Sequence, residues 1–212
     1  MKIPSIFAFM ALSVASSALA DPALLPEDNF DRNELGKGWT VLNGAWELQD
    51  GKLHITELKA DEHAASGRRV LETTDATFRL RFAMSEGTKA FHLGFDPARG
   101  ELDKKGHLYS VIVMADQWRI MKHLDKNRPK EDPNEILAQE KHDFQTGRWY
   151  DLEVSVRGAT VTAKIDSVGE LVATHPTFTV KKPTIVLRVS GDTTQVDELQ
   201  VTGMKKTSQP AN

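Results

Sequence analysis

The sequence predicts an all-β protein built as a two-sheet antiparallel jelly-roll sandwich. From Trp39 onward, apolar residues alternate with polar ones instead of recurring every three or four positions. About a dozen such segments follow one another at intervals of roughly ten residues. Turn signals, Asn43-Gly44 and Asp50-Gly51, separate the first of them. Two stretches, 26–33 and 134–140, are expected to carry a short helical turn.

The first 20 residues have the pattern of a secretory signal peptide. Met1-Lys2 gives a positive start, the run 3–14 is almost wholly apolar, and Ala18-Leu19-Ala20 supplies the small residues of a cleavage site. The apolar run is shorter than the roughly 20 residues that span a bilayer. We therefore expect a secreted or periplasmic protein that begins at Asp21 and has no membrane anchor.

Length and composition narrow the function classes. The chain has 212 residues, so that removal of the signal peptide leaves one expected domain at 21–204 and a flexible polar tail at 205–212. The net charge is -3, so we expect no basic surface that would bind nucleic acid or anionic lipid. The absence of cysteine excludes disulfides, thiol nucleophiles and cysteine-ligated metals. Any chemistry must use His, carboxylates, hydroxyls, Lys or Arg.

The other predicted strands follow from the same alternation. Leu48, Leu53 and Ile55 flank the Asp50-Gly51 turn and predict a hairpin. Further strands are expected over 77–84, 91–96, 107–115, 118–124, 151–157, 161–165, 185–189 and 199–201. The charged stretch 125–143 holds two prolines and predicts a surface excursion, either a solvated loop or a lid over a site.

Four segments of the sequence are similar to those of a known protein family. They are Asp28-Asn29-Phe30-Asp31, Gly44-Ala45-Trp46-Glu47-Leu48, Trp149-Tyr150-Asp151-Leu152-Glu153-Val154 and Val196-Asp197-Glu198-Leu199-Gln200-Val201. In this order they resemble secreted domains of the concanavalin A-like lectin/glucanase superfamily, and they are especially similar to the 3-keto-disaccharide hydrolase domain family. The resemblance implies a lectin/glucanase-like sandwich that acts on oxidised glycosides. The glucanase branch carries a Glu-x-Asp-x-Glu strand, and this sequence has no such triplet. Its nearest counterpart, Asp151-x-Glu153, is interpreted as a solvated outer face.

A polar face interleaved with aromatic residues is predicted in the middle of the chain. Three strands contribute two residues each, namely His92 and Asp96, His107 and Tyr109, and Trp118 and Lys122. If these strands lie side by side, the six side chains line a groove on one concave surface. A sugar needs that mixture, because its apolar C–H face stacks on a flat ring while its hydroxyls seek planar polar partners.

Two alternatives to this groove remain open at the level of sequence. Tyr109 and Trp118 could be core residues, with the histidines facing solvent or bonded to backbone. An inverted strand register would instead bring Arg119 and His123 into the site in place of Lys122, because neighbouring residues on a strand point to opposite faces.

Two metal sites are also considered. Asp28, Asn29, Asp31 and Asp197 offer hard oxygen ligands for calcium. Asp197 is placed by alternation beside buried residues, where a bare carboxylate is costly, although a backbone-capping role explains it as simply. A second set, His92, Asp96 and His107, has ligand types that suit zinc or another divalent ion, but no local spacing marks it.

The predicted function is carbohydrate recognition by a secreted domain, because the glucanase carboxylates are missing. The partner is then a glycan, and calcium is the cofactor that the sequence favours over zinc. The resemblance implies an alternative, a hydrolase that cleaves 3-keto-glycosides by elimination, with His92, Asp96 or His107 as general base. A structural protein of the cell envelope is a third candidate.

Overall fold

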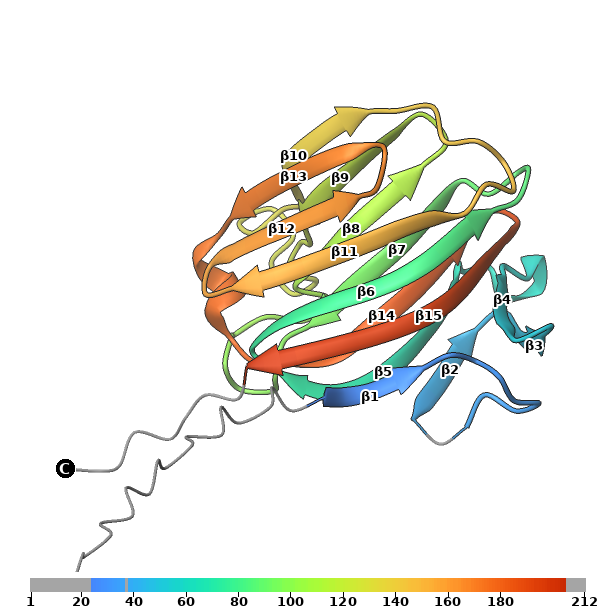
Figure 1. The fold of residues 1–212 in the computed structure, drawn as a ribbon. Coiled ribbons are helices and arrows are strands. Elements are labelled where there is room, and N and C mark those ends of the chain that lie inside the picture. The colour runs from blue at the N-terminus through green and yellow to red at the C-terminus, as the bar shows by residue number, and fades with distance from the viewer. Residues whose placement is uncertain (1–23, 37, 205–212) are drawn as a thin grey trace, which may run out of the picture.

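The computed structural model describes residues 24–36 and 38–204, which form two antiparallel sheets packed face to face (Figure 1). This confirms the prediction of an all-β, two-sheet antiparallel jelly-roll sandwich. The predicted signal peptide at 1–20 and tail at 205–212 lie outside the described residues. No helix in the described part is long and apolar enough to cross a membrane.

The larger sheet, called sheet A here, has eight strands and lies in front in Figure 1. Its order is β13 (Gly169–Thr174), β12 (Thr160–Ile165), β11 (Tyr150–Arg157), β6 (Asp75–Met84), β15 (Thr193–Met204), β4 (Lys52–Thr56) and β3 (Ala45–Gln49), with β1 (Leu24–Asp28) also paired to β15.

The second sheet, called sheet B, has seven strands and lies behind sheet A. Its order is β10 (Glu135–Lys141), β9 (Gln117–Lys122), β8 (Tyr109–Met114), β7 (Ala90–Asp96), β14 (Lys182–Ser190), β5 (Ala65–Thr73) and β2 (Trp39–Asn43). Two short 3-10 helices, η1 (Lys59–Asp61) and η2 (Pro176–Thr179), complete the described elements.

The core fills the space between the two sheets. Along β7, the inward side chains Phe91, Leu93 and Phe95 are fully buried. The ring of Phe95 stacks on that of Tyr109 from β8, with centroids 4.6 Å apart. Burial of each such side chain contributes about 1.5–3 kcal/mol. Every second position of the strand is thereby committed to the core, and the positions between face outward.

The two predicted turns near the N-terminus have different roles. Asp50-Gly51 joins β3 to β4 as expected, with both residues at positive φ (52° and 69°), which confirms the hairpin. Asn43-Gly44 instead carries the chain from β2 in sheet B to β3 in sheet A. Gly44 has φ of 84°, and a Cβ there would lie 2.3 Å from the Cβ of Ala65. Only glycine fits this crossing.

The stretch predicted as a helical turn at 134–140 is a strand. It forms β10, which pairs with β9 and contains a bulge between Ile136 and Ala138. The open edge of β9 supplies hydrogen-bond partners, so tertiary pairing overrides local helix propensity. The predicted surface excursion at 125–143 therefore divides into a loop, residues 125–134, and an edge strand. At 26–33, β1 ends at Asp28 and the chain continues in bends.

Candidate functional site

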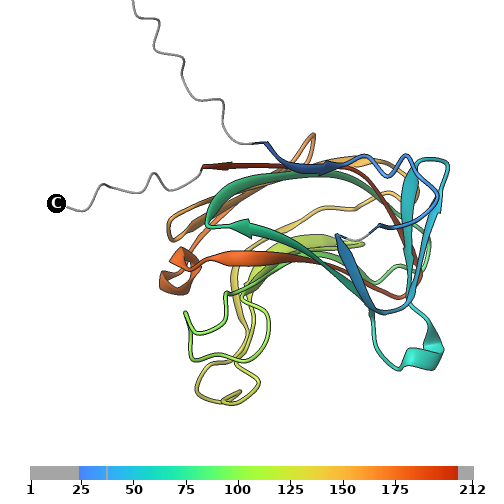
Figure 2. The ribbon, with the colours of Figure 1, turned by 90° about the horizontal axis from the view of Figure 1, so that it is seen from below.

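The outer face of sheet B is bordered by loops on two sides. Figure 2 shows that the loops at 97–106 and 125–134 project away from sheet A on one side of this face and that η1 projects on the other. Between them lies a cleft of about 340 Å³, which continues into a small hollow over β7 and β14. We call this the sheet B cleft, and its polar lining is Asn43, His63, Ser66, Arg68, His92, His107, Ser110, His123, Lys126, Asn134 and Arg188.

Strand alternation explains why these residues meet. Arg188 on β14 lies opposite His92 on β7 and opposite Ser66 on β5. One step along the sheet, Ser110 on β8 lies opposite Gly94 on β7. Because the flanking positions on each strand fill the core, the polar positions between them share the outer face. Side chains from separate parts of the chain thus converge on one surface.

Asp96 lies at the edge of the cleft, in an adjoining hollow, and its carboxylate bonds to two residues that line the cleft. Its Oδ1 accepts a hydrogen bond of 2.5 Å from Nδ1 of His107, and its Oδ2 accepts one of 2.9 Å from Nε of Arg68. Burial alone would raise the pKa of Asp96, but the bonds from His107 and Arg68 lower it below its ordinary value. An ionised Asp96 fixes the proton of His107 on Nδ1 and leaves Nε2 for a ligand.

Two other histidines in the cleft are uncharged at neutral pH. Burial lowers the pKa of His92 to about 3, and the nearby positive charge of Arg188 adds to this effect. Burial likewise lowers the pKa of His123 to about 3, with contributions from His107 and Arg188. Nε2 of His123 lies 2.7 Å from Oγ of Ser110. Both rings are therefore neutral hydrogen-bonding groups.

Arg188 is the least compensated charge of the cleft. Its side chain is half-buried, and within the described residues its guanidinium makes no ion pair and no hydrogen bond. Taking a cation partly out of water without a partner costs free energy. Its planar fork of donors is shaped for a carboxylate or a similar oxyanion.

One wall of the cleft is held by two interlocking loops. Nζ of Lys104 donates to the backbone oxygen of His123 (2.7 Å) and to Asp132 (3.1 Å). Asp125 is fully buried and accepts from the backbone N–H groups of Lys105 and Asn127. These two bonds lower the pKa of Asp125 to about 2. The wall beside His123 is therefore built from ionised groups that hold each other in place.

Three predicted groove residues lie elsewhere. Tyr109 and Trp118 are fully buried on the inner face of sheet B, so the prediction that they contact a ligand is wrong. Lys122 is also buried, and its ammonium pairs with Asp132 and with Glu135 at 2.7 Å. Trp118 and Lys122 are buried because the alternating positions Trp118, Ile120 and Lys122 of β9 face the core.

The inverted register considered from the sequence is the one that the structure has. His123 lines the cleft, whereas Arg119 lies on the outer side of β9 but is not among the residues that line the cleft. His107 joins the cleft although Tyr109 does not, because His107 precedes the first residue of β8. Arg188 and Arg68 also line the cleft, and neither is among the residues predicted from the sequence. Arg188 could have been found, since it is the polar position between Leu187 and Val189 on a predicted strand.

The predicted calcium ligands are used differently. Asp28 accepts from Arg32 (2.5 and 2.9 Å), from Nε1 of Trp39 (2.9 Å) and from Arg69, so two guanidinium groups already balance its charge. Burial raises the pKa of Asp28, and the bonds from Arg32 and Trp39 outweigh this and lower it. A calcium ion is not expected there, because the carboxylate has no free oxygen to offer.

The other proposed metal ligands fit no better. Asn29 and Asp31 bond to each other at the surface. A bulge between Asp197 and Gln200 resets β15, so Asp197 faces outward and caps the N–H of Glu198 at 2.7 Å. In residues 24–36 and 38–204, no group of three or more His, Cys, Asp and Glu could hold a metal ion. This also removes the zinc set of His92, Asp96 and His107.

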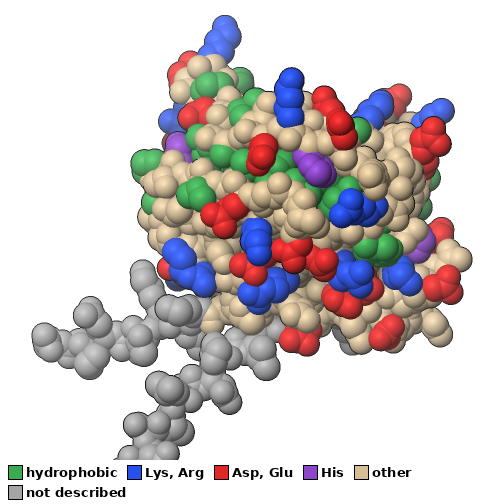
Figure 3. Space-filling view, turned by 45° about the horizontal axis from the view of Figure 1, so that its top comes forward, with side chains coloured by type: hydrophobic (Ala, Val, Ile, Leu, Met, Phe, Trp, Pro, Cys, Tyr) green, Lys and Arg blue, Asp and Glu red, His purple; other side chains and the backbone are tan. Residues whose placement is uncertain are grey.

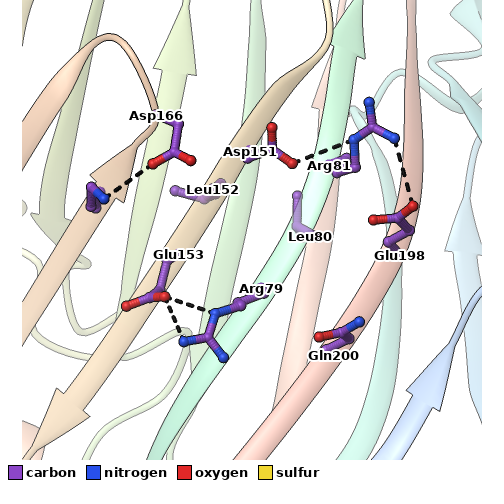
Figure 4. Close-up of a pocket in the computed structure, with 10 residues that line it drawn as sticks. Arg79, Leu80, Arg81, Asp151, Leu152, Glu153, Asp166, Glu198 and Gln200 are labelled. Atoms are coloured by element: carbon purple, nitrogen blue, oxygen red, sulfur yellow. Dashed lines mark hydrogen bonds and ion pairs between the residues drawn. The ribbon is translucent and has the colours of Figure 1, made fainter.

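The outer face of sheet A carries charges of both signs, which are interspersed in the oblique view of Figure 3. A shallow hollow of about 280 Å³ lies there (Figure 4). As interpreted from the sequence, Asp151 and Glu153 lie on this exposed face. Glu153 pairs with Arg79 at 2.7 Å and Asp151 with Arg81 at 3.4 Å. Each carboxylate pairs with an arginine at the surface, in agreement with the interpretation of a solvated outer face.

Comparison with known proteins defines the fold. No protein-family model and no curated protein matches the chain. Among solved structures, the carbohydrate-binding module CBM66 from Bacillus subtilis is similar with a TM-score of 0.59 and 16% identity, over 79% of this chain and 96% of that one. SCLam, a non-specific endo-β-1,3(4)-glucanase of family GH16, gives 0.63 and 9% over 86% and 91%.

A β-glucanase from Bacillus licheniformis gives a TM-score of 0.60 at 6% identity, over 85% of this chain and 98% of that one. Identities this low carry no information on activity, since one fold hosts many functions. What they show is the architecture. The chain has a two-sheet antiparallel jelly-roll sandwich of the kind found in these glucanases and in this carbohydrate-binding module.

Proposed function

We propose that the protein binds a carbohydrate in the sheet B cleft. The observation that carries this proposal is the convergence of hydrogen-bonding side chains from separate strands on one hollow of about 340 Å³. Ligand sites are concave and hold a few convergent polar groups. The fold shared with CBM66 of Bacillus subtilis and with GH16 glucanases supports the proposal at the level of architecture.

The polar groups suit sugar hydroxyls. A hydroxyl is both a donor and an acceptor, so it needs partners of both kinds. The neutral rings of His92 and His123 can donate or accept, and Ser110 does both. Asn43 adds an amide at the opposite side of the cleft. A fixed set of mixed partners on a rigid sheet favours a pyranose over an apolar ligand.

A glycan array followed by calorimetry tests the proposal. The mature chain should bind at least one glycan, and His107→Ala should weaken that binding about tenfold, as expected for the loss of one buried hydrogen bond. His54→Ala is the matched control, because His54 is a half-buried histidine on β4 of sheet A. Failure to bind any glycan would contradict the proposal and leave two candidates, the 3-keto-glycoside hydrolase and the structural envelope protein.

One observation favours a second function, general-base catalysis. The Asp96–His107 hydrogen bond orients the imidazole and leaves Nε2 unbonded within the described residues. On a 3-keto-glycoside, this nitrogen would remove the proton at C2, C1=C2 would form, and the C1–O bond would break with its electron pair on the glycosidic oxygen. That oxygen takes a proton, and water adds to the double bond to complete hydrolysis.

Turnover separates this second function from binding alone. The protein is incubated with a 3-keto disaccharide and with the same disaccharide unoxidised. Elimination predicts cleavage of the oxidised substrate only, and its loss in both His107→Gln and Asp96→Asn with His54→Gln unaffected. Absence of turnover on both substrates, together with glycan binding, would leave the binding function standing alone.

A further inference from the structure

The charge balance of the sheet B cleft departs from that of the whole chain. The chain carries a net charge of -3. Among the residues that line the cleft, Arg68, Lys126 and Arg188 are cationic and none is Asp or Glu. The adjoining hollow of about 480 Å³ adds Arg99 and Lys104 and holds a single carboxylate, Asp96. Positive charge has been gathered on this face of an acidic protein.

Most of this charge is not cancelled locally. Asp96 is shared by Arg68 and His107, and Lys104 is balanced by Asp132. For Arg188 and Lys126, no carboxylate lies within ion-pair distance among the described residues. Lys126 is exposed at the rim, whereas Arg188 is half-buried at the floor, where water compensates it less.

The lining also lacks the groups that recognise a neutral sugar ring. A neutral pyranose is held largely by stacking of its C–H face on an aromatic side chain. No Trp, Tyr or Phe is among the described residues that line the cleft or its two adjoining hollows. Tyr109 and Trp118, from the same strands, point into the core instead. Affinity must therefore come from charge and hydrogen bonds.

We propose that the glycan is acidic and that its anionic group pairs with Arg188. This inference rests on the proposed function and specifies its ligand class. A uronate carboxylate fits the planar guanidinium through two parallel hydrogen bonds. His92, opposite Arg188 on the neighbouring strand, is neutral and can bond to the adjacent hydroxyls. Lys126 extends the positive surface toward the rim. A sulfate ester offers the same chemistry.

Calorimetry with matched oligosaccharides tests the inference. The ligands are oligogalacturonate and oligomannuronate, the carboxyl-reduced neutral form of each, and a sulfated galactan oligosaccharide. At least one acidic ligand should bind about tenfold or more tightly than its neutral counterpart, as expected for a charge-assisted bidentate contact. That preference should shrink as salt is added. Preference for the uronates or for the sulfated sugar identifies the source of the charge.

Three variants locate the effect. Arg188→Gln should abolish the preference for the acidic sugar, and Lys126→Gln, at an exposed position, should reduce it. Arg79→Gln removes the same charge from the outer face of sheet A and should leave the preference unchanged. Circular dichroism of each variant verifies that it is folded.

The outcomes separate the inference from the proposed function. Equal affinity for an acidic ligand and its reduced form would overturn the inference while keeping carbohydrate binding intact. An acidic preference that survives both Arg188→Gln and Lys126→Gln would overturn the placement in this cleft. Failure of every oligosaccharide to bind, neutral or acidic, would overturn the proposed function and the inference with it.

Discussion

The outer faces of the two antiparallel sheets differ in how their charged side chains are paired. On sheet A, cations and carboxylates alternate across neighbouring strands and pair at the surface (Figure 4). Arg79 meets Glu153 at 2.7 Å, and Lys164 meets Asp166 at 3.2 Å. On sheet B, Arg188 is half-buried beside neutral histidines and has no carboxylate partner among the described residues.

The difference supports the proposed placement of a ligand on the outer face of sheet B. A face whose charges cancel within the protein gains little from a charged partner, since the partner must first break existing pairs. A half-buried charge that is not cancelled lowers the stability of the unliganded protein, and a ligand of opposite sign removes that penalty. Sheet B has this property.

The largest effect tests the assignment of inner and outer faces in sheet B. Trp118→Ala should lower the free energy of unfolding by about 3–5 kcal/mol, because it opens a large cavity in the core. Chemical denaturation measures this loss. Arg119→Ala is the control, since it alters the outer side of the same strand, and its effect should stay below about 1 kcal/mol. A Trp118→Ala variant of full stability with impaired glycan binding would reverse the assignment.

The second effect concerns the neutral histidines. In the folded protein, the pKa of His92 and that of His123 are each about 3, below the ordinary value of 6.5 that applies to the unfolded chain. The unfolded chain therefore binds more protons between pH 6.5 and pH 3. The contribution of these two neutral histidines to the free energy of unfolding is fully present above pH 6.5. It is lost as the pH falls from 6.5 toward their pKa of about 3 in the folded protein.

A double variant, His92→Gln with His123→Gln, should remove this pH dependence. Compared with the variant, the natural chain should lose at least about 2 kcal/mol more unfolding free energy between pH 6.5 and pH 3, since each unit of pKa shift corresponds to about 1.4 kcal/mol. Urea titrations across that range measure the difference. His54→Gln on sheet A should follow the natural chain, and identical profiles for the natural chain and the double variant would show that the cleft histidines titrate normally.

The fold was predictable because most strands show an alternation of apolar and polar residues in their own sequence. The site was predictable only in part. His92, Asp96 and His107 were identified as polar positions and lie in the cleft or at its edge. The register of β9 was predicted incorrectly because Lys122, a charged residue, was expected to face outward. It is buried because Asp132 in a loop and Glu135 on β10 pair with its ammonium, and no local sequence pattern predicts these contacts. Arg68 was not predicted because the sequence of its strand, β5, shows no clear alternation of apolar and polar residues. The resemblance to 3-keto-disaccharide hydrolases stays a prediction.

A third effect, of opposite sign on the two faces, concerns arginine removal. Arg188→Gln should raise the free energy of unfolding by about 0.5–1 kcal/mol, because a desolvated charge disappears, as is common where function outweighs stability. Arg79→Gln should lower it by about 0.5 kcal/mol or less, because an exposed ion pair is lost. Thermal unfolding at pH 8, where His92 and His123 are neutral in both states, compares the two variants. A clear loss of stability in Arg188→Gln would mean that its charge is compensated.

The smallest effect measures how weakly the ion pairs of sheet A hold together. A double-mutant cycle of Arg79→Ala and Glu153→Ala should give a coupling energy of about 0.5 kcal/mol or less, because both side chains are substantially exposed (49% and 39%). The coupling should vanish in about 1 M salt, where the screening length falls to about 3 Å. Arg68→Ala with Asp96→Ala, a less exposed pair (35% and 19%), should keep a larger part of its coupling at that ionic strength. Equal salt sensitivity of the two cycles would mean that water reaches both faces alike. The sheet B cleft would then give an anionic ligand no electrostatic advantage over the face of sheet A.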